Sequence, residues 1–249
     1  MKYTALPVLF VLFFASTLSA QFSAEPDVHS TESGDLTVYA VNHGSIAFTF
    51  DGKTIFVDPF GDAALFKNFD APDIIFITDI HGDHHSPETL AGLDTENTRF
   101  VVPSAVADQM ENVNDEHLMI IENEESGEVM GLQVFAIPMY NIPGDETVRH
   151  VKGRGNGYII GFGEKKVYIS GDTEDIPEMR ALEDIDIAFV CMNLPYTMDI
   201  HQASDAVIEF QPVVVYPYHH RGQDIEEFKQ LVDNAGVEVD VRLKNWYPD

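Results

Sequence analysis

Cysteine and basic residues are the two scarcest components of this 249-residue sequence. Cys191 is the only cysteine, so no internal disulfide can form. It ends the apolar run IDIAFVC, which predicts a core position for it. The chain has 14 Lys and Arg residues against 42 Asp and Glu residues, a formal net charge of −28. A protein this acidic repels nucleic acid and anionic membrane surfaces, so neither is an expected partner.

Long apolar runs are absent beyond the N-terminus, and the run found there is short. Residues 1–20 combine Lys2, the apolar run ALPVLFVLFFA and the small residues STLSA, a pattern typical of a secretory signal peptide cleaved after Ala20. A membrane anchor is the less favoured alternative, because a spanning helix needs about 20 apolar residues. We therefore predict an exported protein, periplasmic or extracellular, with no membrane anchor after cleavage.

The rest of the chain predicts one domain. Residues 21–35 are polar and small and predict a loose leader, which leaves a single domain over residues 36–249. The segments DGK (51–53) and FGEKK (162–166) predict hairpins between β-rich runs. Asp199 and Gln202 predict a capping box for the helix HQASDAVIEF, and VEVDVRL (237–243) predicts a last strand. Two β-rich halves that both carry helices predict an α/β fold of two sheets packed face to face with helices outside.

Acidic and imidazole side chains cluster where predicted strands end. The segment DIHGDH follows the buried run DIIFIT, and Asp172 and His219 follow two later runs. Residues two apart in an extended segment point to the same side, so Asp79 and His81 can share one metal while Asp83 and His84 face a second. Such mixed ligands suit zinc, and also manganese or iron. A solvated turn with capping groups is the weaker alternative.

These motifs resemble the metallo-β-lactamase-fold hydrolases. The family pattern His-x-His-x-Asp-His corresponds to DIHGDH, with Asp79 in the place of the first histidine. The bridging aspartate of the family matches Asp172 in SGDT, and its last metal histidine matches His219 in PYHHRG. The segments HGS, DGKTIFVDP and NLPYTM further resemble the branch that includes ascorbate-6-phosphate lactonase-like proteins. The resemblance implies an αββα four-layer sandwich of two mixed sheets and a cleft holding two divalent metal ions, with zinc preferred.

The resemblance also implies roles for residues outside these motifs. Tyr140 and Asn141 stand where the middle metal histidine of the family is expected, so we assign that ligand role to His150, with a plain loop histidine as an equal alternative. Asp58, in FVDPF, matches an aspartate that supports the ligands from behind. His43 matches a histidine of the branch that touches substrate or metal, although a turn histidine is nearly as good an interpretation.

Five further histidines have no expected ligand role. His85 and His220 neighbour ligands but are expected to point elsewhere, whereas His29, His117 and His201 are predicted to be isolated surface residues. A carboxylate at Asp79 would make a two-metal core less positive, which favours harder ions and a higher pKa of the bound water.

The expected activity is hydrolysis. A metal-bridging hydroxide, oriented by Asp83, would attack the carbonyl carbon or phosphorus of an ester, lactone, amide or phosphodiester, and metal-bound water or His43 would supply a proton to the leaving group. Tyr140, Asn193 and Tyr196 are predicted to line the cleft and bind a small-molecule substrate. The alternative is a catalytically weakened metal- or ligand-binding domain of the same fold, favoured by Asp79 and by the displaced His150.

Overall fold

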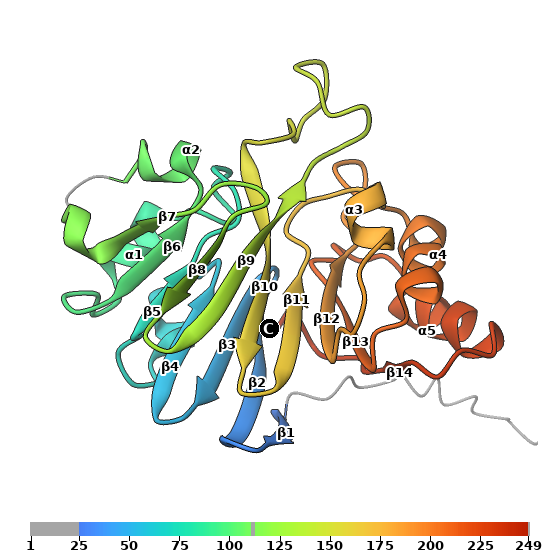
Figure 1. Ribbon diagram of the computed structural model, residues 1–249, viewed down its shortest axis with the longest axis horizontal. Helices are drawn as coiled ribbons and strands as arrows, with labels where there is room; N and C mark the ends of the chain where they lie inside the picture. Colours follow the sequence, from blue (N-terminus) through green and yellow to red (C-terminus); the bar gives the residue numbers. More distant parts are fainter. Residues whose placement is uncertain (1–24, 111–112, 249) are drawn as a thin grey trace, which may run out of the picture.

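Residues 25–110 and 113–248, described by a computed structural model, form two seven-stranded sheets that pack face to face (Figure 1). The predicted signal peptide lies outside these residues. Across the first sheet the order is β1 (Asp27–Thr31), β2 (Gly34–Asn42), β3 (Ser45–Phe50), β4 (Lys53–Val57), β5 (Ile74–Phe76), β6 (Arg99–Val102) and β7 (Leu118–Ile120). Across the second it is β14 (Asp240–Val241), β13 (Val214–Tyr218), β12 (Ile187–Cys191), β11 (Lys165–Ile169), β10 (Gly155–Phe162), β9 (Leu132–Met139) and β8 (Ser126–Val129).

Both sheets are mixed, which confirms the expected fold class. Strands β1 to β4 and β8 to β11 pair antiparallel, whereas β4 to β7 and β11 to β14 pair parallel. The parallel halves need crossover connections, and these carry the helices to the outer faces. Because parallel strands end at the same edge, the loops that follow β5, β11 and β13 can converge there.

Aromatic side chains fill the space between the sheets. The ring of Phe48 lies 5.3 Å from that of Phe162 and 5.8 Å from that of Phe189, so residues from both sheets meet in one apolar layer. Cys191 is fully buried there, as its sequence context predicted. A second apolar cluster, centred on Phe56 and Phe66, lies on the outer face of the first sheet.

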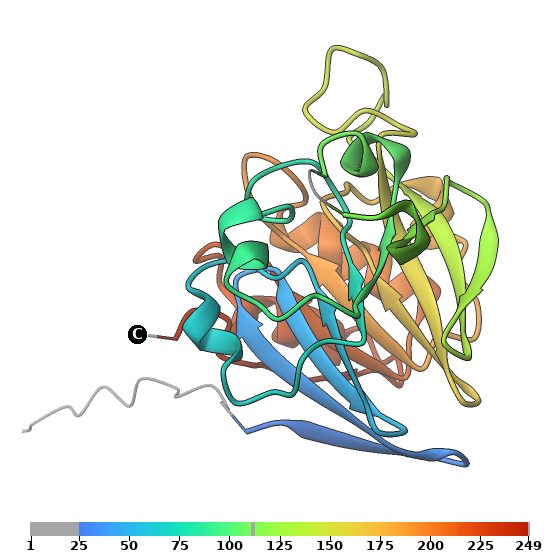
Figure 2. The same ribbon diagram turned by 90° about the vertical axis from the view of Figure 1, so that its left-hand side faces the viewer.

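Helices cover both outer faces (Figures 1 and 2). The first sheet carries η1 (Ala63–Phe66), α1 (Pro87–Ala91), α2 (Ser104–Ala107) and η2 (Asp115–His117), and the second carries α3 (Pro177–Arg180), α4 (Ile200–Phe210) and α5 (Ile225–Asn234). The predicted capping box at α4 is present, with the Asp199 side chain accepting from the backbone N–H of Gln202. In the described part of the chain, no helix combines the length and apolarity that a membrane crossing requires.

Two sequence expectations need correction. Residues 27–31, assigned to a loose leader, form β1, which pairs with β2 from Asp27–Val38 to Thr31–Gly34. The pairing is possible because Leu36 and Val38 of β2 are buried, which anchors the hairpin to the core. The run VEVDVRL forms only the two-residue strand β14, at the edge of the second sheet. Both predicted hairpins are confirmed, with Phe50 opposite Lys53 and Phe162 opposite Lys165.

Candidate metal centre

The candidate ligands lie at one end of the sandwich and come from four connections. DIHGDH follows β5, Asp172 follows β11, His219 follows β13, and His150 lies in the long connection from β9 to β10. That connection projects past the ends of the sheets at the top of Figures 1 and 2. The first loop is held at its far end by the cap of α1, where the Ser86 side chain accepts from the N–H of Thr89 at 3.2 Å. A rigid loop of this kind fixes the directions of the ligands.

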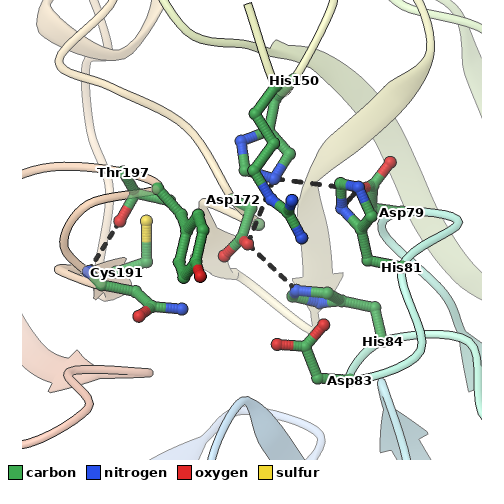
Figure 3. A network of polar contacts seen from close by, with 12 residues as sticks. Asp79, His81, Asp83, His84, His150, Asp172, Cys191 and Thr197 are labelled. Atoms are coloured by element: carbon green, nitrogen blue, oxygen red, sulfur yellow. Dashed lines mark hydrogen bonds and ion pairs between the residues drawn. The ribbon is translucent and has the colours of Figure 1, made fainter.

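Asp172 lies at the centre of the cluster, between His84 and His150 (Figure 3). Its Oδ2 is 3.3 Å from Nε2 of His84 and 3.3 Å from Nε2 of His150, and its Oδ1 is 3.5 Å from Nε2 of His219. His219 Nε2 is also 3.6 Å from Oδ2 of Asp83. Two ligands that share one tetrahedral zinc ion are each about 2.0–2.2 Å from it, which puts them roughly 3.3–3.6 Å apart. The spacing around Asp172 therefore fits shared metal ions.

Buried polar atoms without hydrogen-bond partners support the same conclusion. Among the described residues these include Nε2 of His84, His150 and His219, together with Oδ1 of Asp172. A buried polar group without a partner costs about 1–3 kcal/mol, and four around one space are unusual in a native fold. Imidazole nitrogens and a carboxylate are ligands of zinc and related divalent ions. The residues present therefore fit the expected metal.

The charges of the cluster also favour a cation at this point. Burial alone would lower the pKa of His84, but the carboxylates of Asp172 and Asp58 outweigh it and raise that pKa well above its ordinary value. Burial alone would raise the pKa of Asp172, whereas the imidazoles of His219 and His84 hold it well below its usual range. The carboxylates of Asp172 and Asp58 therefore stabilise a positive charge at this point, which a proton or a divalent ion can supply.

Asp79, His81 and His150 form a second group of possible ligands. Nε2 of His150 is 3.9 Å from Oδ2 of Asp79, but Nδ1 of His81 is only 2.5 Å from the same oxygen, a hydrogen-bond distance. Asn141 accepts from Nδ1 of His150 at 2.8 Å, which leaves Nε2 bare and directed at Asp172. Asn141, which stands where the family histidine was expected, thus orients the histidine that replaces it.

Arg154 is a residue of this site that the sequence analysis missed. Its Nε and Nη2 donate to the two carboxylate oxygens of Asp79 at 3.1 and 3.0 Å, and its Nη1 donates to the carbonyl of Arg149 at 2.8 Å. Burial would raise the pKa of Asp79, but the His81 hydrogen bond and the charges of His84, His81 and Arg154 lower it to about 2. Only its place in the same GRG loop as His150 could have suggested Arg154 from sequence.

Gly155, the residue after Arg154, allows the chain to come close enough for the ion pair between Arg154 and Asp79. A Cβ atom at Gly155 would lie 2.8 Å from the carbonyl oxygen of Thr78 and 3.3 Å from Oδ1 of Asp79. Only glycine allows the start of β10 to approach the ligand loop this closely.

Asp58 lies behind His84, at the position that the sequence analysis gave it. Its Oδ2 is 2.7 Å from Nδ1 of His84, and its two oxygens accept from the N–H and hydroxyl of Thr78 at 2.8 and 2.6 Å. An ionised carboxylate only accepts, so Nδ1 of His84 keeps its proton and Nε2 is the nitrogen that could bind a metal ion at the centre.

His43 lies at the open side of the centre, on a backbone with φ of 55°. Its Nε2 is 3.3 Å from Oδ2 of Asp83, and its Nδ1 is 3.0 Å from the hydroxyl of Tyr247. The backbone N–H of Arg221 donates to that hydroxyl at 2.6 Å. Since Asp83 can only accept, the hydrogen bonds run from Arg221 N–H to Tyr247, from Tyr247 to His43, and from His43 to Asp83. Burial lowers the pKa of His43, which keeps the ring neutral near pH 7.

The three predicted substrate-binding residues differ in their positions. Tyr196 is half-buried at the mouth of the centre, and Asn193 is buried with an unpartnered Oδ1. The structure does not support the predicted substrate contact of Tyr140. Its ring is buried, and its hydroxyl donates to Glu178 at 3.0 Å. His85 and His220 are buried and belong to none of the ligand groups formed by the described residues.

The fold and the site define the chain as a metal-dependent hydrolase with the metallo-β-lactamase fold. Residues 37–219 match the family described as beta-lactamase superfamily domain. The chain is 30% identical over 218 residues to the UPF0173 metal-dependent hydrolase of Staphylococcus carnosus strain TM300, covering 79% of this chain and 94% of that protein. The chain therefore belongs to the UPF0173 metal-dependent hydrolases of the β-lactamase superfamily.

Solved structures agree with this assignment. A protein from Parabacteroides distasonis ATCC 8503, named as a metal-dependent hydrolase, superposes with a TM-score of 0.80 at 34% identity, covering 91% of this chain and 100% of that one. A metallo hydrolase from the hyperthermophilic archaeon Ignicoccus hospitalis KIN4/I gives a TM-score of 0.72 at 23% identity, covering 86% and 96%, which shows the fold alone.

Proposed function

We propose that this chain is an exported hydrolase that binds two divalent metal ions unequally and cleaves an ester, lactone, amide or phosphodiester. The observation that carries the proposal is the set of bare, buried ligand atoms around Asp172, from His84, His150 and His219.

The two metal positions differ in their ligands. Asp83, His84, Asp172 and His219 would hold the tighter ion, because their spacing matches shared coordination. Asp79, His81 and His150 would hold the weaker one, because Arg154 and His81 already engage the oxygens of Asp79. Zinc suits the first set best, and the carboxylate at Asp79 keeps manganese and iron as candidates for the second.

The chemistry assigns separate roles to the protein's own groups. Divalent ions in these positions supply Lewis acidity and a water of lowered pKa. In the net reaction the water oxygen bonds to carbon or phosphorus, the bond to the leaving oxygen or nitrogen breaks, and the leaving atom takes a proton. Asp83 orients the attacking water. His43, oriented by Tyr247, would donate a hydrogen bond from Nε2 to the leaving atom once the substrate displaces its contact with Asp83, and the proton that the attacking water gives up would pass to that atom.

Metal analysis combined with a substrate screen tests this function. We expect bound divalent metal in purified protein, loss of hydrolysis of model esters, lactones or phosphodiesters with a chelator, and recovery with zinc. His84→Ala and His219→Ala should lose metal and activity while the matched variant His85→Ala retains both. A protein that binds no transition metal after reconstitution would refute the proposal.

One observation favours the alternative of a catalytically weakened metal-binding domain. Asp79 is both the departure from the family pattern and the partner of Arg154, so the weaker metal position, that of Asp79, His81 and His150, has a carboxylate that is already paired. Stoichiometric metal without turnover of any ester, lactone, amide or phosphodiester in the screen would support this alternative.

Export is proposed on the pattern of residues 1–20. Expression of the full chain in a bacterial host should give a mature protein that starts at Gln21 by intact mass and is found outside the cytoplasm. Full-length protein retained in the cytoplasm would contradict this part of the proposal.

A further inference from the structure

Two arginines lie against one aromatic ring at the mouth of the metal centre. The Cζ atom of Arg149 is 4.5 Å from the ring centroid of Tyr196, and that of Arg221 is 5.4 Å from it. Arg149 directly precedes His150, and Arg221 follows His219 by two residues. Three separate loops thus bring two guanidinium groups to the same ring.

Hydrogen bonds join this group to the metal ligands. Asn141 donates from Nδ2 to the carbonyl of Tyr196 at 2.8 Å, while its Oδ1 accepts from Nδ1 of His150 at 2.8 Å. On the other side, the backbone of Arg221 is held by Tyr247, whose hydroxyl contacts His43. The backbones of Tyr196 and Arg221 are therefore connected to the centre by hydrogen bonds.

The charges of Arg149 and Arg221 are not neutralised by the protein. Both side chains belong to exposed residues, and no carboxylate of the described residues lies within ion-pair distance of either. Arg154, Arg180 and Arg242, by contrast, each pair with an aspartate or glutamate. In a chain with three acidic residues for each basic one, unpaired cations beside the site favour the binding of an anion.

We infer that Arg149 and Arg221 bind an anionic group of the substrate, a carboxylate or a phosphate, beside the ring of Tyr196, which both guanidinium groups approach. The planar guanidinium fork matches the oxygens of either anion, and a remote charged group held this way positions the scissile bond over Asp172. The inference rests on the proposed hydrolase function and names its substrate class.

Binding measurements test the inference without turnover. Glutarate and phenyl phosphate serve as probes in calorimetric titrations of metal-loaded protein at low ionic strength. We expect Arg149→Gln and Arg221→Gln each to weaken binding of at least one probe about tenfold, the loss of one charge-assisted hydrogen bond, and the double variant to weaken it further. Arg149→Lys and Arg221→Lys should retain part of the affinity. The preferred probe tells a carboxylate site from a phosphate site.

Arg99→Gln is the matched control, because Arg99 is also exposed and has no carboxylate partner in the described residues but lies on β6. It should leave binding unchanged, and metal content should be equal in all variants. Unchanged binding of both probes by the double variant would overturn the inference, since the anions would then bind the metal or the general surface alone.

Turnover separates this inference from the proposed function. The 4-nitrophenyl monoester of glutarate and 4-nitrophenyl butyrate share a leaving group, but only the first is anionic. In the double variant we expect kcat/KM to fall at least tenfold for the anionic ester, mainly through KM, and to stay constant for the neutral one. Arginine-dependent anion binding without hydrolysis of any ester, lactone, amide or phosphodiester in the screen would refute the function and keep the inference. Equal hydrolysis of the anionic and the neutral ester, by wild type and double variant alike, would keep the function and refute the inference.

Discussion

Arg154 and Asp79 form a two-point ion pair beside the metal ligands, with donor–acceptor distances of 3.1 and 3.0 Å. Asp79 stands where the metallo-β-lactamase resemblance expects a neutral histidine, so on its own it would add one negative charge to the centre. The guanidinium cancels that charge. The expectation that Asp79 makes a two-metal core less positive therefore needs correction, because the Asp79–Arg154 pair is as neutral as the histidine it replaces.

This pair should contribute to the stability of the metal-free protein. Arg154→Gln leaves the fully buried carboxylate of Asp79 with a weaker partner, and we expect a loss of about 2–3 kcal/mol in the free energy of unfolding. In Arg154→Gln/Asp79→Asn the buried charge is also removed, so part of the loss should be recovered. The coupling between the two side chains is measured by urea denaturation of four chelator-treated proteins: wild type, Arg154→Gln, Asp79→Asn and the double variant. Additive effects of the two substitutions would show that the pair contributes nothing.

Asp58 should determine how tightly the metal is held, although it touches only the far nitrogen of His84. Asp58→Asn replaces an acceptor-only group with an amide, so the fixed tautomer of His84 is lost. We expect the affinity for zinc to fall by about 10–100-fold, measured by competition with a chromogenic chelator. Asp62→Asn, which alters only the exposed cap of η1, is the control. Equal affinities in all three proteins would contradict the role of Asp58.

Local motifs carried much of what could be predicted from the sequence. Strand-end clusters such as DIHGDH reveal candidate ligands because strand and ligands are contiguous in the chain. Arg154 could not be found this way, since it meets Asp79 across 75 residues and through the close approach at Gly155. Tyr247 meets His43 across 204 residues, from a part of the chain with no motif. Contacts of this kind depend on how the two sheets pack, which residue patterns do not encode locally.

Tyr247 should orient His43 without taking part in metal binding. Tyr247→Phe removes the hydroxyl that contacts Nδ1 of His43, so the ring loses the contact that fixes its tautomer. We expect kcat to fall about fivefold or more, the effect of one hydrogen bond, with a changed pH profile and an unchanged metal content. Tyr140→Phe removes a hydroxyl that contacts Glu178 instead and should leave kcat and its pH profile as in wild type. A Tyr247→Phe enzyme with wild-type kcat and pH profile would exclude the positioning role.

His29 is the clearest error of the sequence analysis outside the site, because an expected surface residue is buried. Its Nε2 is 3.0 Å from the hydroxyl of Tyr216, which donates to Asp27 at 2.6 Å, and Lys244 donates to the other oxygen of Asp27 at 2.6 Å. This network ties β1 of the first sheet to β13 of the second. It explains why residues Asp27–Thr31 of the predicted leader form a strand.

The network predicts a pH dependence of stability. Burial is the main cause that lowers the pKa of His29 below 6.5; the charges of Arg242 and Lys165 act in the same direction, and those of Asp27 and Asp240 oppose them. The folded state therefore favours the neutral ring, so this contribution is complete above pH 6.5 and is lost as the pH falls below it. Between pH 7.5 and 5 Asp27 stays ionised, because Lys244 and Tyr216 outweigh its burial and lower its pKa.

His29→Gln keeps a polar partner for Tyr216 but cannot take up a proton. Its stability deficit relative to wild type should therefore be largest at pH 7.5 and should shrink steadily toward pH 5. Urea denaturation of both proteins at several pH values gives this difference directly, because all other residues are the same in the two proteins. A difference that is constant with pH, or that grows as the pH falls, would mean that folding does not depend on keeping His29 neutral.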